Sequence, residues 1–314
     1  MRIVALMFIG MGLVSLISTE SPALTFTLQG EFGHDNLQLK YGGWADVDAQ
    51  HRLLVSETTA FSGTPNSDLA VFDADQHFVG SYGSAFFDFG ATVAAAPNGH
   101  TYVFQSANIL DLDASFASAG TFGSHAFGGG IATDLNSNVY ITDGTNYSVT
   151  KYSPGGQFLL SFTPVSPHDL LHPVSLAVAP DGTIIVADSF HDRIETFDAA
   201  GNYLSTINTT VAGLIGGHVR DIALGADGTI FTLEDGSGNY SFNDRGLGAF
   251  ARDGSLLGYY NTSNTLSDIA LDGHTLYGVD TTNAKIQIFS VPEPASLALL
   301  ALPLLLIGRR RNAR

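Results

Sequence analysis

The sequence predicts an all-β fold, a closed β-propeller of six four-stranded blades. Composition is the first reason. Of 314 residues, 35 are Gly, 21 Phe and 11 Tyr, which suits short strands joined by tight turns, because Gly is costly in a helix interior. The second reason is a unit of about 45 residues that recurs along the chain. The third is a pair of repeat positions, one carrying mostly small and the other mostly aromatic side chains.

The fourth copy, residues 172–207, shows the repeat most plainly. It contains four apolar runs bounded by turn residues such as Asp181 and Gly182, as expected for a meander of four strands. A shift of about 45 residues superposes 127–162 on it without a gap. A fifth copy follows it, and weaker copies start near Tyr41, Phe89 and Thr265. Strands in the fourth copy are expected at 176–179, 183–187, 193–197 and 203–207.

Two columns of equivalent residues favour a ring of blades over an open array. A radial stack of sheets is narrowest at its axis, so the innermost strand needs a small side chain there, while aromatic groups fill the wider part of the wedge. The inner column is Asp46, Ala94, Ala132, Ala177, Ala223 and Ala270, and the outer column is Phe72, Leu112, Tyr152, Phe197, Phe250 and Phe289.

The sequence also indicates how the ring closes. The sixth copy stops after its third strand, at Phe289-Ser290. The missing fourth strand is found near the N-terminus, where 28–33 resembles 78–83, the fourth strand of the first copy. We therefore expect the N-terminal strand to complete the last blade and to cover an otherwise open sheet edge.

The third to fifth copies resemble NHL repeats, and the resemblance covers roughly 250 residues. It implies a six-bladed propeller and leaves function open, since one scaffold can carry many sites. The second copy departs from the pattern with Gln105 at the acidic position, and the first with Gln50-His51 at the turn. The best match is the fourth copy, through Pro173, Ala177, Val178, Asp181, Gly182, Val186, Ala187, Asp188, Arg193, Ile194, Phe197 and Gly201.

The N-terminus has the pattern of a secretory signal peptide. Arg2 precedes an apolar run over 3–17, and Ser21 and Ala23 fit the small residues before a cleavage site. Residues 1–23 are therefore predicted to be a signal peptide, with a retained membrane anchor as the alternative. The propeller domain is predicted to span 24–290.

The C-terminus, 291–314, combines an extended Pro-containing tetrapeptide, an apolar stretch over 295–308 and a basic end. These three parts in this order resemble a PEP-CTERM sorting tail, which implies recognition by an exosortase-type membrane enzyme. Fourteen helical residues span about 21 Å, short of a hydrocarbon core of about 30 Å, which suits a transient anchor. Short apolar helices are thus expected at both termini. The predicted processing residues are Val291, Pro292, Glu293, Pro294, Arg309, Arg310 and Arg311.

An acidic residue ends the second strand in five of the six copies. Such a ring could bind cations or polar sugars, or each carboxylate could accept backbone N–H bonds in its own turn. The second interpretation is favoured, because a position that recurs with the repeat usually belongs to its architecture. The column is Glu57, Asp143, Asp188, Glu234 and Asp280.

A metal site is a further candidate. His172 and His218 start neighbouring copies, and Asp221 and Asp268 take equivalent places in the fifth and sixth. Imidazoles and carboxylates suit Zn²⁺ or Ca²⁺, and some NHL-like propellers, among them amidating lyases and lactonase-like hydrolases, use axial metals. The other copies carry Tyr, Phe or Thr at the histidine position. No cofactor is therefore expected, with Ca²⁺ or Zn²⁺ in the channel as the alternative.

Two insertions, near 58–67 and 236–247, fall between the second and third strands of their copies. Both should project at one end of the propeller, where loops on a rigid scaffold carry function, although insertions are also merely tolerated there. Aromatic faces stack on sugars and amides bond hydroxyl groups, so the second insertion is a candidate carbohydrate site. Its candidate residues are Asn239, Tyr240, Phe242, Asn243 and Asp244.

The chain lacks cysteine and has a net charge of −17, which excludes disulfides and thiolate chemistry and disfavours nucleic acid. No phosphate loop or Gly-x-Ser-x-Gly elbow is present. We expect an exported binding or scaffold module, transiently anchored in the inner membrane through its termini. Exosortase and exopolysaccharide or an envelope protein are the expected partners. A metal-dependent lyase or lactonase with an axial site, or a spacer without ligand, are the alternatives.

Overall fold

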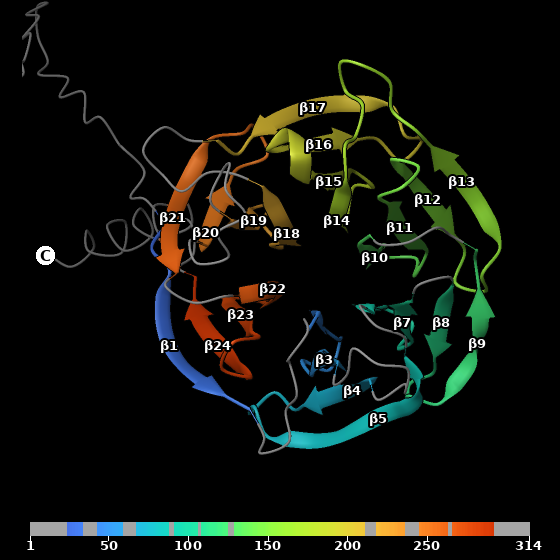
Figure 1. Cartoon of the computed structure of the whole chain (residues 1–314), viewed down its shortest axis with the longest axis vertical. Helices are drawn as coiled ribbons and strands as arrows, with labels where there is room; N and C mark the ends of the chain where they lie inside the picture. Colours follow the sequence, from blue (N-terminus) through green and yellow to red (C-terminus); the bar gives the residue numbers. More distant parts are fainter. Residues whose placement is uncertain are drawn as a thin grey trace, which may run out of the picture. The chain divides into compact units, whose positions relative to one another are not determined.

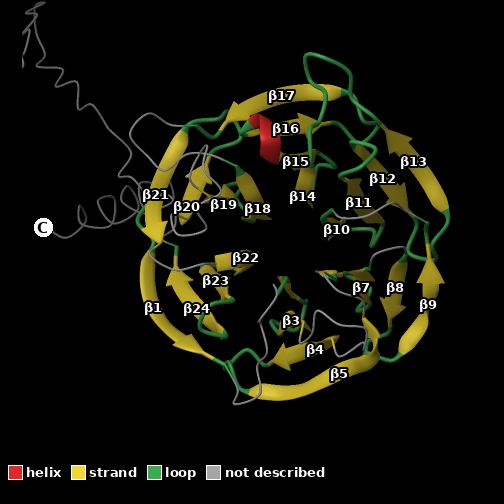
Figure 2. Ribbon diagram, viewed as in Figure 1, coloured by secondary structure: helices red, strands yellow, loops and turns green. Residues whose placement is uncertain are grey.

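The computed structural model describes residues 24–33, 43–58, 67–87, 91–105, 108–124, 129–210, 218–235, 245–262 and 266–291. Within them lie six four-stranded antiparallel sheets, arranged as the blades of a propeller (Figures 1 and 2). The all-β, six-bladed prediction is therefore confirmed. The single helix of the described residues is the short 3₁₀ helix η1 (Ser189–His191).

Each blade is a meander with its first strand next to the central axis and its fourth at the circumference (Figure 1). The second strands are almost entirely buried, whereas the fourth strands consist mainly of exposed and half-buried residues. Blade 1 contains β2 (Ala45–Val47), β3 (Leu53–Thr58), β4 (Ser67–Phe72) and β5 (Phe78–Phe87); blade 2 contains β6 (Thr92–Ala95), β7 (Thr101–Phe104), β8 (Ile109–Leu112) and β9 (Ser118–Phe122); blade 3 contains β10 (Ile131–Thr133), β11 (Val139–Asp143), β12 (Ser148–Tyr152) and β13 (Phe158–Phe162).

The second half of the ring repeats this order. Blade 4 contains β14 (Pro173–Val178), β15 (Ile184–Asp188), β16 (Arg193–Phe197) and β17 (Tyr203–Asn208); blade 5 contains β18 (Val219–Leu224), β19 (Ile230–Asp235), β20 (Arg245–Phe250) and β21 (Leu256–Thr262); blade 6 contains β22 (Leu266–Asp272), β23 (Thr275–Asp280), β24 (Lys285–Ser290) and β1 (Thr27–Phe32). The third strand of blade 5 begins at Arg245, so the insertion is shorter than the sequence suggested.

The N-terminal strand completes the last blade, as predicted. β1 pairs antiparallel with β24, from Thr27 opposite Ser290 to Phe32 opposite Ile286 (Figure 1). Preceding residues extend this clasp, since the Leu24 amide donates to Leu257 O of blade 5 over 2.7 Å. The ring is therefore closed by segments from opposite ends of the sequence.

The core lies between neighbouring blades. The predicted outer column is buried in every copy, with Phe72, Phe197, Phe250 and Phe289 at most 1% exposed. Contacts between blades are close. A Cβ added at Gly201, which has φ +85°, would lie 2.6 Å from the Phe162 ring of the preceding blade. A turn glycine thus satisfies both the backbone conformation and the packing.

Leu24–Glu293 form one compact unit. Val291 is the last described residue; it is 4% exposed and its amide donates to His274 O over 2.8 Å. The predicted signal peptide, the apolar terminal helices and the tail from Pro292 onward lie outside the described residues. Over the ranges that are described, no helix has the length and apolarity needed to cross a membrane.

Candidate binding site at one end of the channel

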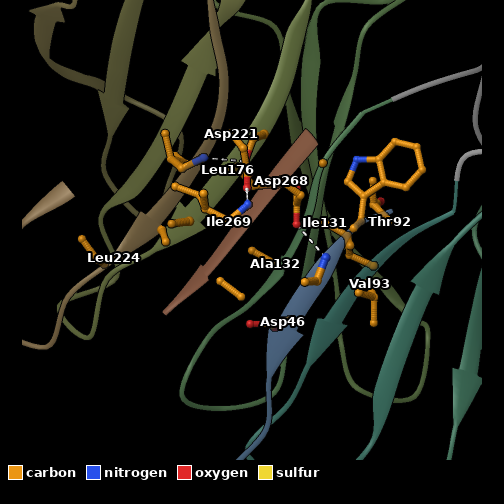
Figure 3. A pocket seen from close by; sticks show the side chains of 18 of the residues that line it. Asp46, Thr92, Val93, Ile131, Ala132, Leu176, Asp221, Leu224, Asp268 and Ile269 are labelled. Atoms are coloured by element: carbon orange, nitrogen blue, oxygen red, sulfur yellow. Dashed lines mark hydrogen bonds between the residues drawn. The ribbon is translucent and has the colours of Figure 1, made fainter. Parts of the chain in front are cut away.

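The six innermost strands surround a cavity of about 210 Å³ on the axis of the propeller (Figure 3). The inner column of small residues lines it, because Ala132, Ala177, Ala223 and Ala270 all face this space. Arg220 is the cationic residue among the lining side chains. All positions of the predicted inner column except Ala94 thus line the cavity.

Three aspartates of the lining connect consecutive blades. Asp221 Oδ2 accepts the Ile269 amide over 2.8 Å and Asp268 Oδ2 accepts the Ala45 amide over 2.6 Å (Figure 3). Asp46 Oδ2 accepts the Ala95 amide over 2.8 Å. These bonds link blades 5, 6, 1 and 2 in succession, so the carboxylates stabilise the closed ring.

Burial perturbs the same three carboxyl groups. It raises the pKa of Asp46 to about 6 and also raises the pKa of Asp221. The pKa of Asp268 is raised well above its ordinary value, first by burial and then by the neighbouring Asp221. Two neighbouring carboxylates do not ionise together readily, so burial and the charge of Asp221 both favour the protonated form of Asp268.

The four residues of the predicted metal site do not form one ligand set. Asp221 and Asp268 come together, but each already accepts a backbone amide of the next blade. His172 and His218 instead contact an aromatic ring. In the part of the chain that the structure describes, no group of three or more His, Asp or Glu side chains is placed to hold a metal ion. These residues therefore do not fit a metal, and we derive no metal-dependent step.

The histidines lie at the end of the propeller where the first strand of each blade begins, here called the entry end. Second strands end and third strands begin at the same end, because neighbouring strands are antiparallel. Phe190 of η1 stacks on His172, with ring centroids 4.5 Å apart and 12° between planes, and contacts His218 at 5.5 Å. Phe190 is 45% exposed. His172, Phe190 and His218 thus form an aromatic surface that a ligand can reach.

The surroundings of His172 favour its neutral form. Partial burial of its ring, followed by the positive charge of Arg220 and by His218, lowers the pKa of His172. His218 Nδ1 lies 2.7 Å from Ser189 O and 2.9 Å from Asp192 Oδ1. His218 is therefore fixed by hydrogen bonding, whereas His172 is available as a neutral base or hydrogen-bonding group.

Blade 5 adds charged groups at the entry end. Asp235 ends β19 and lies opposite Arg245, which begins β20. Arg220 Nη1 is 3.4 Å from Asp235 Oδ2. Arg245 is only 5% exposed, and its Nε has no hydrogen-bond partner. We refer to Arg220, Asp235 and Arg245 as the arginine cluster.

The repeated acidic column is architectural at Asp143, Asp188 and Asp280. Asp143 Oδ1 accepts the amides of Thr145 and Asn146, and Asp280 Oδ1 accepts those of Thr282 and Asn283. Asp188 accepts the Leu171 amide and pairs with His191 and Arg193. Glu234 differs, because Oε1 accepts only the Thr232 hydroxyl and Oε2 is buried without a partner. The favoured interpretation of the column is confirmed for Asp143 and Asp280.

The predicted ligand residues Tyr240, Phe242, Asn243 and Asp244 lie outside the described residues. The segment that carries them joins Asp235 to Arg245, so both of its attachment points lie at the entry end. Phe190, Arg220 and Arg245 were not among the residues predicted from the sequence. Phe190 carried a weak signal, as a large apolar residue in a turn, but nothing local distinguished the two arginines.

No protein-family model matches this chain, and no curated protein sequence does so. Solved structures are similar in fold. They include virginiamycin B lyase from Staphylococcus aureus (TM-score 0.58, 12% identity, 85% of this chain and 100% of that chain). A Xanthomonas campestris gluconolactonase gives TM-score 0.58 at 16% identity over 88% and 96%. A Bacteroides thetaiotaomicron protein of unknown function gives 0.61 at 13% over 86% and 76%. These similarities show the fold alone, and the NHL and sorting-tail resemblances stay predictions.

Proposed function

We propose that the protein is an exported propeller with NHL-like repeats that binds saccharide at its entry end, as a non-catalytic module of the cell envelope or its polysaccharide matrix. The observation that carries this proposal is Phe190, 45% exposed between His172 and His218. An aromatic group held on a rigid scaffold beside polar side chains suits a sugar ring. The predicted ligand segment with Tyr240 and Phe242 is attached at the same end.

The test is a glycan array followed by calorimetric titration of the purified full-length chain. We expect the Tyr240→Ala/Phe242→Ala double variant and Phe190→Ala each to weaken saccharide binding at least about tenfold. Phe158→Ala is the matched control, because Phe158 is 59% exposed but begins an outer strand at the opposite end. A folded protein that binds no glycan, or Phe190→Ala with unchanged affinity, would contradict the proposal.

Export and sorting are part of the proposal. The basic N-terminus with its apolar run and the terminal Pro-Glu-Pro, apolar and arginine segments support it. Replacing Pro292, Glu293 and Pro294 by alanine should leave the protein with the membrane fraction of an exosortase-containing host. Release that is unaffected by this change would argue against processing at the tail.

Lyase or lactone-hydrolysing activity is the second candidate. It is favoured by His172, whose lowered pKa keeps a neutral imidazole at the entry end. A histidine-to-alanine variant of the similar virginiamycin B lyase is described as catalytically inactive and was crystallised with quinupristin. Incubation with quinupristin and with gluconolactone, followed by mass spectrometry, tests both chemistries. Turnover lost in His172→Ala and kept in His100→Ala would support catalysis; intact substrates would exclude these two reactions.

A further inference from the structure

Arg245 is unusual among the cationic side chains of this acidic protein. Of the lysines and arginines that the structure describes, all but Arg245 lie within 4.0 Å of a carboxylate. The pairs are Arg52–Asp48, Lys151–Asp134, Arg193–Asp188, Arg220–Asp235, Arg252–Asp181 and Lys285–Glu31.

Burial makes the missing partner significant. Arg245 is 5% exposed, and its Nε is buried with no hydrogen-bond partner. Burial, and then the positive charge of Arg220, lower the pKa of Arg245 to about 10, although Asp235 opposes them. A guanidinium charge removed from water is costly unless it is paired and hydrogen-bonded. The propeller therefore contains a cation whose partner is not among the described residues.

The neighbours of Arg245 do not supply that partner. Asp235 faces Arg245 across the strand pair, but its Oδ2 is directed to Arg220 at 3.4 Å and its Oδ1 is buried without a hydrogen bond. Within the arginine cluster, two guanidinium groups are thus accompanied by one carboxylate, so these three residues carry a net charge of +1. His172, close enough to be influenced by Arg220, adds no negative charge. The arginine cluster is electrostatically suited to an anion.

We propose that Arg220 and Arg245 form a subsite for an oxyanion, so that the saccharide bound at the entry end is an acidic one carrying a carboxylate. This inference rests on the proposed saccharide-binding function. Arginine suits the role because its planar guanidinium donates two parallel hydrogen bonds to a carboxylate. Arg220 is the accessible member and lines the channel, whereas the buried Arg245 lies behind it, opposite the Asp235 that Arg220 contacts, and contributes charge.

The experiment titrates the full-length protein with trigalacturonate and with its fully methyl-esterified form, which removes the charge and keeps the sugar rings. We expect the acid to bind at least about tenfold more tightly than the ester, and added salt to weaken this preference. Arg220→Gln and Arg245→Lys should each lose at least about tenfold in affinity for the acid. Arg252→Gln is the matched control, because Arg252 pairs with Asp181 in turns at the opposite end.

The outcomes separate the subsite from the saccharide function. Equal affinity for acid and ester, or Arg220→Gln with unchanged affinity, would overturn the acidic subsite while leaving saccharide binding intact. If neither saccharide binds, the result contradicts the saccharide function. The anion site is then tested separately with inorganic phosphate. A rise in melting temperature with phosphate that disappears in Arg220→Gln would support it, and no rise would overturn it. Arg220 is exposed, so this variant is informative even if Arg245→Lys does not fold.

Discussion

Glu234 offers the sharpest test of the electrostatic reasoning. Its side chain is completely buried at the end of β19, where Oε1 accepts the Thr232 hydroxyl over 2.7 Å and Oε2 has no partner. Burial raises the pKa of Glu234 from 4.5 to about 8. The folded protein therefore holds this proton at pH values where the unfolded chain has released it.

The sign of the pH effect follows from this difference. The contribution of Glu234 to stability is greatest below about pH 4.5, where this side chain is protonated in both states, and falls as pH rises towards about 8. Each pH unit in that window lowers the contribution of Glu234 to the free energy of unfolding by about 1.4 kcal/mol. Glu234→Gln keeps the acceptor for Thr232 and removes the ionisation. We therefore compare the free energy of unfolding of the variant with that of the native protein. The difference, variant minus native, should increase by about 3 kcal/mol between pH 5 and about pH 7.5.

Urea unfolding of the full chain, followed by fluorescence of Trp44, the only tryptophan, measures this difference. Glu31→Gln is the control, because Glu31 is about half-exposed on β1 and pairs with Lys285; removal of this exposed ion pair should not make the variant gain stability as the pH rises. A difference between Glu234→Gln and the native protein that stays constant with pH would refute the reasoning, since it would mean that Glu234 ionises alike in the folded and unfolded states.

Three further predictions concern the closure of the ring and the tail. Gly258→Ala should destabilise the protein by at least about 2 kcal/mol in urea unfolding, because the added Cβ would overlap the Leu24 carbonyl group. Gly30→Ala is the control, because the space around its Cβ is open; its stability should lie within about 0.5 kcal/mol of that of the native protein. Phe26→Ala should lower the free energy of unfolding by about 3 kcal/mol in the same assay, because Phe26 is 3% exposed and its ring meets that of Phe231 edge-on at 6.0 Å. The exposed Leu28→Ala is the control. If both variants have equally small effects, the N-terminal clasp contributes little to stability. If the tail is processed, the intact mass of the released protein should include Val291, because this residue is buried in the last blade; a C-terminus before Val291 would contradict this.

Repeat counting predicted the architecture because each blade is encoded locally. Four apolar runs separated by turn residues specify a meander without reference to the rest of the chain, and the small and aromatic columns mark its inner and outer parts. The clasp was also predictable, since 28–33 resembles the fourth strand of another copy and the sixth copy lacks one. The same logic assigned Asp143 and Asp280 to their own turns.

The site was only partly predictable. Asp221 and Asp268 occupy equivalent positions in neighbouring blades and therefore meet, but their role in holding the next blade depends on an amide from a different copy. His172 and His218 also lie in neighbouring blades, yet Phe190 of η1 contacts both rings. A repeat alignment places backbone positions, and it does not say which side chain of a turn fills the space between them.

The sequence by itself determined the number of blades, the order of strands and the way the ring closes, because these depend on patterns within each copy. Only the tertiary structure decided the raised pKa values of Glu234, Asp221 and Asp268 and the missing partner of Arg245. Those properties depend on burial and on distances between groups from different strands. A buried charge is stabilised or destabilised by whatever the fold brings beside it, and the local sequence does not contain that information.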